Sequence, residues 1–484
     1  MNLYALLRSR FPADRSAPCL ILTDGHDVSY GELEEGVGQL ASLLTAKGVG
    51  VGDRVAAQTA KSPQAVMLYL ATLQIGAVFL PLNPAYTAAE VGYFLKDAEP
   101  AMFVTDAVAL AREALSLRPR MEVHDARPDD LAALVYTSGT TGRAKAAMLS
   151  HDNLASNALA LQSAWGFTKG DVLLHALPIF HVHGLFVAIH CALLTGIPML
   201  WLPRFDEDAV MAALPRATVM MGVPTFYSRL MADPRFTRQS AAHMRLFISG
   251  SAPLLESAFD AFAARTGLRI LERYGMSEAQ MITTNPLDGE RSAGSVGFPL
   301  PGVRLRIAGG EETGVVEISG PSVASGYWRN PEKTAQALTT DGFFITGDIG
   351  RLDTEGRLWL SGRANDLIIS GGLNVYPKEI ELVLDELPGV VESAVIGLPH
   401  ADFGEAVVAV IAGSGDEAEI IRAAREQLAA FKAPKRVLFV EDLPRNAMGK
   451  VEKAALRRAY AALFEGRLKV SPTNDLDKDK GRAG

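Results

Sequence analysis

The stretch YTSGTTGRAKAAMLSH, from Tyr136 to His151, follows an apolar run and brings hydroxyl residues, glycines and two cations together. Hydroxyls, backbone N–H groups freed by glycine and nearby cations suit a polyphosphate. A flexible Ser/Thr turn is the alternative interpretation. The P-loop pattern G-x-x-x-x-G-K-[ST] is excluded, because only two residues separate Gly139 from Gly142, and Ala146 follows Lys145. The loop therefore predicts a phosphate site of another kind.

Bulk composition limits the class of protein. The 484 residues exceed one ordinary core, so we expect at least two domains. A formal charge of −8 argues against nucleic acid as the partner. Two distant cysteines, Cys19 and Cys191, form neither a disulfide framework nor a metal set, and the first residues show no export signal, which together indicate the cytoplasm.

The most apolar segment, Gly184–Leu202, raises the question of a membrane span. It nearly reaches spanning length, but it contains His190, Thr195 and a Gly-Ile-Pro break at 196–198. A buried helix, a turn and a core strand is the better interpretation. No membrane partner is expected.

Short apolar runs alternate with helical patterns through the first part of the chain. Runs at 54–60, 77–83, 101–106, 217–224, 245–250 and 268–275 predict strands of mostly parallel sheets in an α/β fold. From about Gly294 short strands and turns predict a β-rich section, expected as a distorted β-barrel. A second compact α/β pattern follows. The expected domains are 1–364 and 365–468, with a disordered tail at 469–484.

Three further motifs carry groups that could serve a nucleotide. ERYGMSEAQ offers a tyrosine at a strand end, Ser277 and Glu278, a carboxylate of the kind that holds Mg²⁺. Asp348 lies in a Gly-Asp turn and could accept two ribose hydroxyls. Lys450 follows a glycine in a polar loop. Each motif taken singly has an ordinary explanation that is as good or better. Ser277 could cap a helix, Asp348 could serve the turn itself, and Lys450 could be a solvated surface charge.

In their order along the chain, these pieces, with ISGSAPL at 248–254 and SGGLNVYPKEIE at 370–381, resemble the adenylate-forming superfamily of acyl-CoA synthetases, luciferases and peptide-synthetase adenylation domains. The resemblance runs over nearly the whole chain. It implies an enzyme that joins a carboxylate to AMP, releases pyrophosphate and passes the acyl group to a thiol. It also implies ATP, Mg²⁺ and coenzyme A as ligands, and a small C-terminal domain that is mobile.

Roles follow from the resemblance position by position. The catalytic set is Lys450, Glu278 as the Mg²⁺ ligand, and Ser277. The ATP-binding set is Thr137, Ser138, Gly139, Thr140, Thr141, Gly142, Lys145, Gly250, Ser251, Ala252, Glu272, Arg273, Tyr274, Gly275, Met276, Ser277, Asp348 and Arg363. Ser370, Gly371 and Gly372 are expected to line the CoA tunnel. Asn365 and Asp366 are the expected hinge, although many relatives have Lys-Asp there, and Ala144-Lys145-Ala146 replaces the usual Pro-Lys-Gly.

The acid is expected to carry a second carboxylate. An arginine on the wall of an acyl pocket would be costly unless it met an anion, and two arginines suggest a bidentate grip on a dicarboxylate. The texture of the chain resembles the malonyl-CoA synthetases, which also accept methylmalonate. The substrate-binding set is then His181, Arg229, Ser251, Arg273 and Met276. The alternative is that either arginine forms an internal ion pair. A zinc site at His181 and His183 lacks further ligands nearby.

Other functions stay open at this point. The chain could activate another short or medium-chain acid, or load a carrier protein as a stand-alone adenylation enzyme. A catalytically dead nucleotide binder is disfavoured, because Glu278, Asp348 and Lys450 are all present. A monomer or a homodimer is expected.

Overall fold

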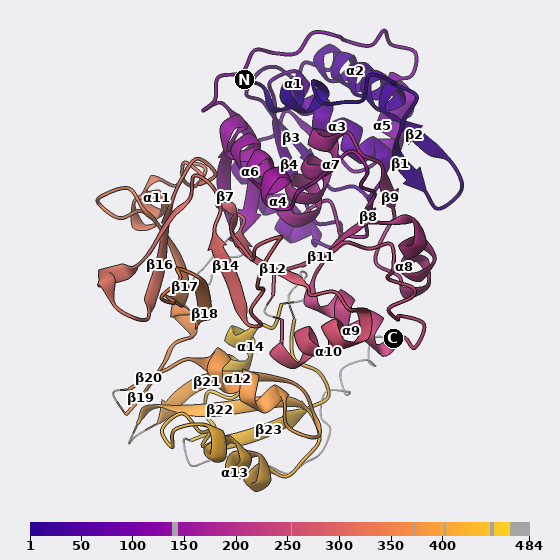
Figure 1. Cartoon of the computed structure of the whole chain (residues 1–484). Coiled ribbons are helices and arrows are strands. Elements are labelled where there is room, and N and C mark those ends of the chain that lie inside the picture. The colour runs from indigo at the N-terminus through magenta and orange to yellow at the C-terminus, as the bar shows by residue number, and fades with distance from the viewer. Residues whose placement is uncertain (138–143, 253, 372, 401–402, 446–449, 465–484) are drawn as a thin grey trace, which may run out of the picture. The chain divides into compact units, whose positions relative to one another are not determined.

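The computed structural model describes residues 1–137, 144–252, 254–371, 373–400, 403–445 and 450–464, and Figure 1 shows its elements. Contacts divide the chain into two compact units, Met1–Leu360 and Ser361–Gly484. They are called the N-terminal and C-terminal units below. The expected boundary at 364/365 lies a few residues beyond this division and remains a prediction. The expected tail, 469–484, is outside the described residues.

A five-stranded sheet in the N-terminal unit has the order β5-β3-β4-β6-β7. The first four strands pair in parallel, and β7 is antiparallel to β6. The bounds are β3 Arg54–Ala57, β4 Val78–Pro81, β5 Met102–Val104, β6 Leu131–Thr137 and β7 Lys145–Ser150. The continuous apolar runs of β4 and β6 suit strands that are buried on both faces.

A second sheet of 13 strands has the order β15-β16-β17-β18-β14-β13-β12-β11-β10-β8-β9-β1-β2. Its largely parallel part contains β1 Pro18–Leu22, β2 Asp27–Ser29, β8 Leu173–His175, β9 Met199–Trp201, β10 Val219–Gly222, β11 Leu246–Ser249 and β12 Leu271–Met276. The remainder contains β13 Gln280–Thr284, β14 Ser295–Pro299, β15 Arg304–Ile307, β16 Gly314–Ser319, β17 Phe344–Leu352 and β18 Leu358–Arg363. The predicted mixed α/β fold is confirmed.

The β-rich section takes a form that differs from the expected one. Antiparallel pairs join β12 to β13, β13 to β14, β14 to β18, β15 to β16 and β16 to β17. Because β15 and β2 are the two edges of the strand order, the described strands form an open sheet and no closed barrel. The expected hairpins are present as an extension of the parallel part.

Several helices of the N-terminal unit begin at a side-chain cap. Ser29 and Glu32 form a capping box at α2, as Thr87 and Glu90 do at α4, and Ser150 caps α6. The bounds are α1 Leu3–Arg8, α2 Tyr30–Ala46, α3 Pro63–Gln74, α4 Ala88–Ala98, α5 Ala107–Ala114, α6 His151–Ala164, α7 Ile189–Thr195, α8 Glu207–Ala213, α9 Pro224–Ala232, α10 Glu256–Thr266 and α11 Pro331–Gln336.

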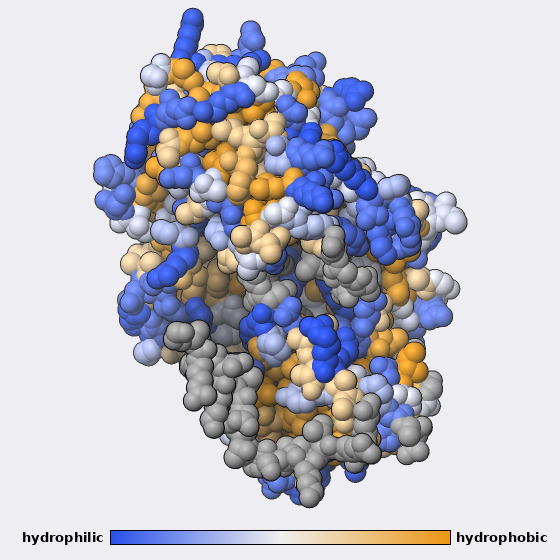
Figure 2. Space-filling view, turned by 180° about the vertical axis from the view of Figure 1, so that it is seen from behind, coloured by the Kyte–Doolittle hydropathy of each residue, from blue (hydrophilic) through white to orange (hydrophobic). Residues whose placement is uncertain are grey.

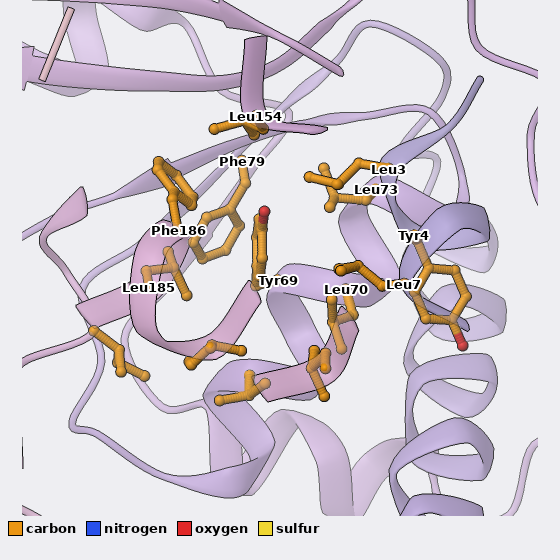
Figure 3. Close-up of a cluster of buried hydrophobic side chains, with 14 of the residues drawn as sticks. Leu3, Tyr4, Leu7, Tyr69, Leu70, Leu73, Phe79, Leu154, Leu185 and Phe186 are labelled. Carbon is orange, nitrogen blue, oxygen red and sulfur yellow. The ribbon is translucent and has the colours of Figure 1, made fainter. Parts of the chain in front are cut away.

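The main core lies around α3, whose residues from Ala65 to Gln74 are all buried. Figure 3 shows Tyr69 and Leu70 of this helix among Leu3, Leu7 and Phe186 and other apolar side chains. A helix that is apolar all round is expected to be buried on all sides. The N-terminal helix α1 is held there partly by Asn2, whose Nδ2 donates to the carbonyl of Leu73 over 2.7 Å.

The apolar segment Gly184–Leu202 has the predicted form. A π-helix at His183–Ala188 runs into α7, whose C-cap residue Gly196 has φ +73°, and the core strand β9 follows. Within the described parts of the chain, no helix combines the length and the apolar character that crossing a bilayer requires. On the face shown in Figure 2, hydrophilic and hydrophobic residues are interspersed.

The C-terminal unit contains a smaller sheet in which β22 pairs with β21, β19 and β23. The bounds are β19 Ile368–Ser370, β20 Leu373–Val375, α12 Pro377–Asp385, β21 Val390–His400, β22 Gly404–Gly413, α13 Glu417–Gln427, β23 Arg436–Val440 and α14 Lys453–Ala459. β22 is almost wholly buried and supports two apolar clusters, which agrees with the predicted second α/β pattern.

Candidate active site

Buried polar groups gather where the parallel strands β10, β11 and β12 end. Ser249, the last residue of β11, pairs in register with Gly222 on one side and with Glu272 on the other. Buried polar atoms without a hydrogen-bond partner include Ser249 Oγ, Glu272 Oε2, Arg273 Nε and both ring nitrogens of His183. Carboxyl ends of parallel strands are the usual place of a ligand. This edge is therefore the candidate binding site.

Arg273 is the central cation of this edge. Its side chain is 3% exposed, and its Nη2 donates to Ser251 Oγ over 3.3 Å. A Cβ at Gly250 would lie 2.5 Å from the guanidinium carbon, so only glycine allows this close approach. Burial lowers the pKa of Arg273 to about 10, which leaves it charged at neutral pH. Among the described residues Arg273 makes no ion pair.

Ser251 has φ +71°, a left-handed conformation that is unusual for a residue other than glycine. Ser251 and Ala252 are both exposed. The strained backbone brings the Ser251 hydroxyl to Arg273, so two residues of the predicted substrate-binding set meet.

Two histidines precede and begin the π-helix. His181 is half-buried and packs on Phe180, with ring centroids 4.5 Å apart. His183 is buried, and burial, followed by the nearby charge of Arg273, lowers its pKa well below the usual value. A neutral imidazole at this position retains one N–H donor and one acceptor. Within the described ranges no three metal-binding side chains are grouped to hold an ion.

Glu272 and Arg273 are neighbours on β12, and alternation along a strand directs their side chains to opposite faces. Glu272 is 4% exposed, and its Oε1 accepts from the Leu254 backbone N–H over 3.4 Å. Burial raises the pKa of Glu272 to about 8. The carboxyl group therefore does not neutralise Arg273.

The next residues of β12 reach the β-rich section. The Tyr274 hydroxyl donates to Asp348 Oδ2 over 2.5 Å, and both side chains are buried. At Gly275 a Cβ would lie 2.1 Å from the carbonyl oxygen of Gln280, so the bulge between Tyr274 and Gly275 requires glycine. Met276 ends the strand, and half-buried Ser277 begins the turn that leads to Glu278.

Glu278 lies in a second polar cluster that includes the end of β6. Glu278 Oε1 accepts from Thr137 Oγ1 over 3.2 Å and from the Tyr327 hydroxyl over 3.0 Å. The Lys145 ammonium lies 4.2 Å from the centroid of the Tyr327 ring. Two predicted ATP-binding residues, Thr137 and Lys145, and the predicted Mg²⁺ ligand Glu278 thus meet around one tyrosine. The sequence analysis missed Tyr327, and the SGYW segment at 325–328 is the signal that could have drawn attention to it.

Arg229 is exposed, unlike the buried groups of this edge. It is on α9, its side chain is 62% exposed, and its Nε is 3.8 Å from Glu207 Oε1. A pair with this exposure contributes little to stability. The structure thus brings Arg273 and Ser251 together, while Arg229 faces solvent beside a carboxylate.

Several predicted residues lie outside the described chain. These are Ser138, Gly139, Thr140, Thr141 and Gly142 of the phosphate loop, together with Gly372 of the CoA loop.

Predicted residues of the C-terminal unit occupy loops and strand ends. Lys450 is exposed, immediately before the bridge between Val451 and Arg445. Asp366 Oδ1 accepts from Arg457 Nη2 over 2.8 Å, and the side chain of Asn365 beside it is exposed. Arg363 is exposed at the end of β18, and Ser370 is buried in β19. Gly371 has φ +59°, and its N–H donates to the Phe403 carbonyl.

Comparison with known proteins gives the same family along most of the chain. Residues 8–328 match the family described as AMP-binding enzyme, and residues 379–450 match the AMP-binding enzyme C-terminal domain. The chain is 33% identical to a malonate–CoA ligase of Arabidopsis thaliana, over 91% of this chain and 86% of that protein. It is 35% identical to the mitochondrial malonate–CoA ligase ACSF3 of Mus musculus, over 85% and 83%.

Solved structures agree. The ATP-bound crystal structure of MatB from Rhodopseudomonas palustris has a TM-score of 0.92 and 49% sequence identity, and the likeness covers 96% of this chain and 99% of that one. The profile match over 8–328 spans more than half of the chain, in agreement with the site geometry. The chain belongs to the AMP-binding enzyme family.

Proposed function

We propose that the protein is a malonyl-CoA synthetase that also accepts methylmalonate. Malonate and ATP would give malonyl-AMP and pyrophosphate, and the CoA thiol would then give malonyl-CoA and AMP. The observation that carries the proposal is the guanidinium of Arg273, which is buried and has no carboxylate partner in the described parts of the chain. A buried cation without a counterion is costly, so an anionic group of the substrate is the expected partner.

The groups near Arg273 suit the carboxylate of malonate that is not adenylated. The Ser251 hydroxyl is already on the guanidinium, and the unpartnered Arg273 Nε and the imidazole of His183 supply further donors. Charged hydrogen bonds of this kind are roughly twice as strong as neutral ones. Similarity to two malonate–CoA ligases supports the same acid. His181, Met276 and solvent-facing Arg229 complete the proposed acid site.

The ATP site is proposed from the second cluster and the adjoining turns. Thr137, Lys145 and the loop that follows Thr137 would hold the outgoing pyrophosphate. Gly250–Ala252, Glu272 and Tyr274–Ser277 would border adenine and the α-phosphate, and Asp348 would take the ribose with Arg363. A carboxylate is the protein ligand that Mg²⁺ prefers, and Glu278 Oε2 makes no hydrogen bond within the described chain. Glu278 therefore fits Mg²⁺, which would neutralise phosphate charge when bound.

The C-terminal unit is proposed to serve both half-reactions. Lys450 would stabilise the charge that develops when an anionic acid attacks a triphosphate. Ser370, Gly371 and Gly372 would line the path of the CoA thiol, and Asn365 and Asp366 would act as the hinge. A cytoplasmic location is part of the proposal.

The decisive experiment is an acid panel that monitors AMP release with and without CoA. Malonate should exceed acetate, butyrate and benzoate in kcat/KM, and AMP release should depend on CoA. A higher value for butyrate would contradict the dicarboxylate assignment. Loading of a carrier protein without a response to CoA would favour a stand-alone adenylation enzyme instead.

A further inference from the structure

The second polar cluster contains a residue to which no role has been given. Tyr327 is 5% exposed, and its hydroxyl donates to Glu278 Oε1 over 3.0 Å. The Thr137 hydroxyl donates to the same oxygen over 3.2 Å. Both donors thus hold one oxygen of the carboxylate. The other oxygen, Oε2, is left without a protein hydrogen bond in the described residues.

The backbone of Tyr327 is fixed from two sides. It bridges to Ala147 of β7, with hydrogen bonds from the Met148 N–H to the Gly326 carbonyl and from the Trp328 N–H to the Ala146 carbonyl. On the other side the Tyr327 N–H donates to Thr334 Oγ1 over 2.9 Å. The ring therefore has little freedom to follow a moving carboxylate.

The Glu278 backbone is also anchored to this segment. The Ala324 N–H donates to the Glu278 carbonyl over 2.7 Å. The carboxylate and the tyrosine that holds it thus belong to one hydrogen-bonded unit.

The ring of Tyr327 also contacts a cation, Lys145. The Lys145 ammonium lies 4.2 Å from the ring centroid, a cation–π distance. Lys145 also pairs in register with Thr137 across β6 and β7. One side chain thereby sets the positions of a carboxylate and of an ammonium group.

We propose that Tyr327 is a positioning residue for the nucleotide site: its hydroxyl holds Glu278 so that Oε2 is presented to Mg²⁺, and its ring holds Lys145 for the phosphates. The inference rests on the proposed function, because it assumes that Glu278 meets the metal of Mg²⁺–ATP. The two parts of the side chain have separable tasks. Removing the hydroxyl should affect the metal, and removing the ring should additionally affect ATP.

Tyr327→Phe and Tyr327→Leu separate the two tasks. In Tyr327→Phe the free Mg²⁺ concentration for half-maximal adenylation should rise about tenfold, the size expected for one lost hydrogen bond to a charged group. Its rate at saturating Mg²⁺ should return to within about twofold of wild type. Tyr327→Leu should show the same metal shift and, in addition, a KM for ATP raised several-fold through Lys145.

A binding measurement provides a readout without turnover. Calorimetric titration of ATP, in the absence of any acid, should show that Mg²⁺ improves the affinity of wild type much more than that of Tyr327→Phe. ATP affinity in EDTA should be equal in the two proteins. Tyr30→Phe is the matched control, because it also removes a buried tyrosine hydroxyl, one that donates to the Ile197 carbonyl over 2.9 Å. Its Mg²⁺ dependence should equal that of wild type.

Glu278→Gln identifies the source of a failure. If Glu278→Gln shifts the Mg²⁺ dependence and Tyr327→Phe does not, the positioning role is wrong and the proposed metal ligand stands. If neither variant shifts it, the assignment of Glu278 to the metal fails as well. A loss in Tyr327→Phe that saturating Mg²⁺ does not restore, matched by Tyr30→Phe, would indicate general destabilisation and would also overturn the proposal.

Discussion

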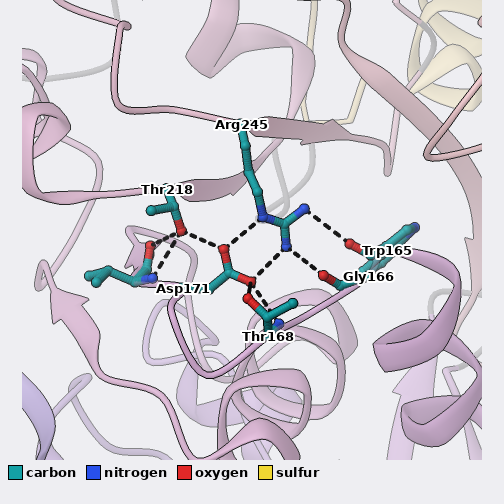
Figure 4. Close-up of polar contacts among 7 residues, drawn as sticks. Trp165, Gly166, Thr168, Asp171, Thr218 and Arg245 are labelled. Atoms are coloured by element: carbon teal, nitrogen blue, oxygen red, sulfur yellow. Dashed lines mark hydrogen bonds and ion pairs between the residues drawn. The ribbon is translucent and has the colours of Figure 1, made fainter.

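Two regions of the N-terminal unit each contain one arginine and one buried carboxyl group, and they use them in opposite ways. In the first, Arg245 Nε and Nη2 donate to Asp171 over 2.7 and 2.8 Å, and the carbonyls of Trp165 and Gly166 accept from the same guanidinium (Figure 4). In the second, Glu272 and Arg273 are adjacent on β12 but point to opposite faces. In the first region the arginine and the carboxylate form an ion pair, whereas in the second neither group has an ion-pair partner among the described residues.

The titration behaviour reflects this difference. Burial alone would raise the pKa of Asp171, but hydrogen bonds from Arg245 and its other neighbours hold it below its usual value. Burial raises the pKa of Glu272 to about 8, since no cation reaches it. Removing one partner of a buried arginine–carboxylate pair destabilises a fold, while an unpaired arginine in a buried strand edge indicates a place kept for a ligand. Four substitutions test this reading.

The largest effect is expected for Arg273→Ala. Loss of a buried charged donor to the second carboxylate should lower kcat/KM for malonate roughly 100- to 1,000-fold. Butyrate should lose less than about tenfold, because it has no group for Arg273 to bind. Steady-state kinetics with both acids measures the ratio. Arg273→Lys should recover only part of the loss, because a lysine lacks the planar fork.

Equal losses for malonate and butyrate would contradict this role. The melting temperature of Arg273→Ala is measured separately, because the deleted side chain leaves a cavity whatever its role in binding.

Arg245→Ala should instead act on stability. It leaves the buried Asp171 carboxylate without its cation, and the cost should be about 3 kcal/mol, near the low end of the range because Arg245 is partly exposed. Urea unfolding measures the change. The ratio of malonate to butyrate kcat/KM should stay at the wild-type value. The double variant Arg245→Ala/Asp171→Ala should be less destabilised than the sum of the single variants; strict additivity would show that the pair is not coupled.

Glu272→Gln should change the pH dependence of stability. In the folded protein Glu272 keeps its proton up to about pH 8, whereas an ordinary glutamate loses it near 4.5. The free energy of unfolding of wild type should therefore fall, relative to Glu272→Gln, by about 1.4 kcal/mol per pH unit between these values and level off above the upper one. Denaturation of the ligand-free proteins from pH 6 to 9 measures this. A constant difference between the two proteins would refute the raised pKa.

The smallest effect is expected for Arg229→Gln. An exposed arginine beside Glu207 contributes through a screened charge, so kcat/KM for malonate should fall by about tenfold or less, and the loss should shrink as salt is added. Arg235→Gln, another exposed arginine, is the matched control. A loss as large as that of Arg273→Ala would show that burial does not distinguish the two arginines.

The sequence predicted the parallel strands and most of the nucleotide cluster, because these depend on local pattern. Continuous apolar runs gave β3, β4, β10 and β11, and the order of motifs along the chain pointed to Thr137, Lys145 and Glu278. The sequence could not predict which distant strands pair. The β-rich section is an open sheet because its edges are strands far apart in the sequence. Tyr327 reaches Glu278 only because its segment pairs with β7.

The sequence also could not predict which side chains are exposed. The sequence offers Arg229 and Arg273 on equal terms, and only the structure shows that the one on α9 faces solvent and the one on β12 is buried. The unpartnered ring nitrogens of His183 could not be predicted either, because packing decides whether a ring nitrogen has a hydrogen-bond partner.

The π-helix at His183–Ala188 has a consequence for how the chain tolerates length changes. A π turn contains one residue more than an α turn, so deleting a single residue there would restore α-helical winding. The segments before and after the deletion would stay close to their present register, because the π turn is what accommodates the extra residue. The side chains within His183–Ala188 would be re-spaced, so His183 would move relative to the strand edge while the buried helix α7 kept its place. A one-residue deletion in this segment therefore tests whether the extra residue serves to place His183.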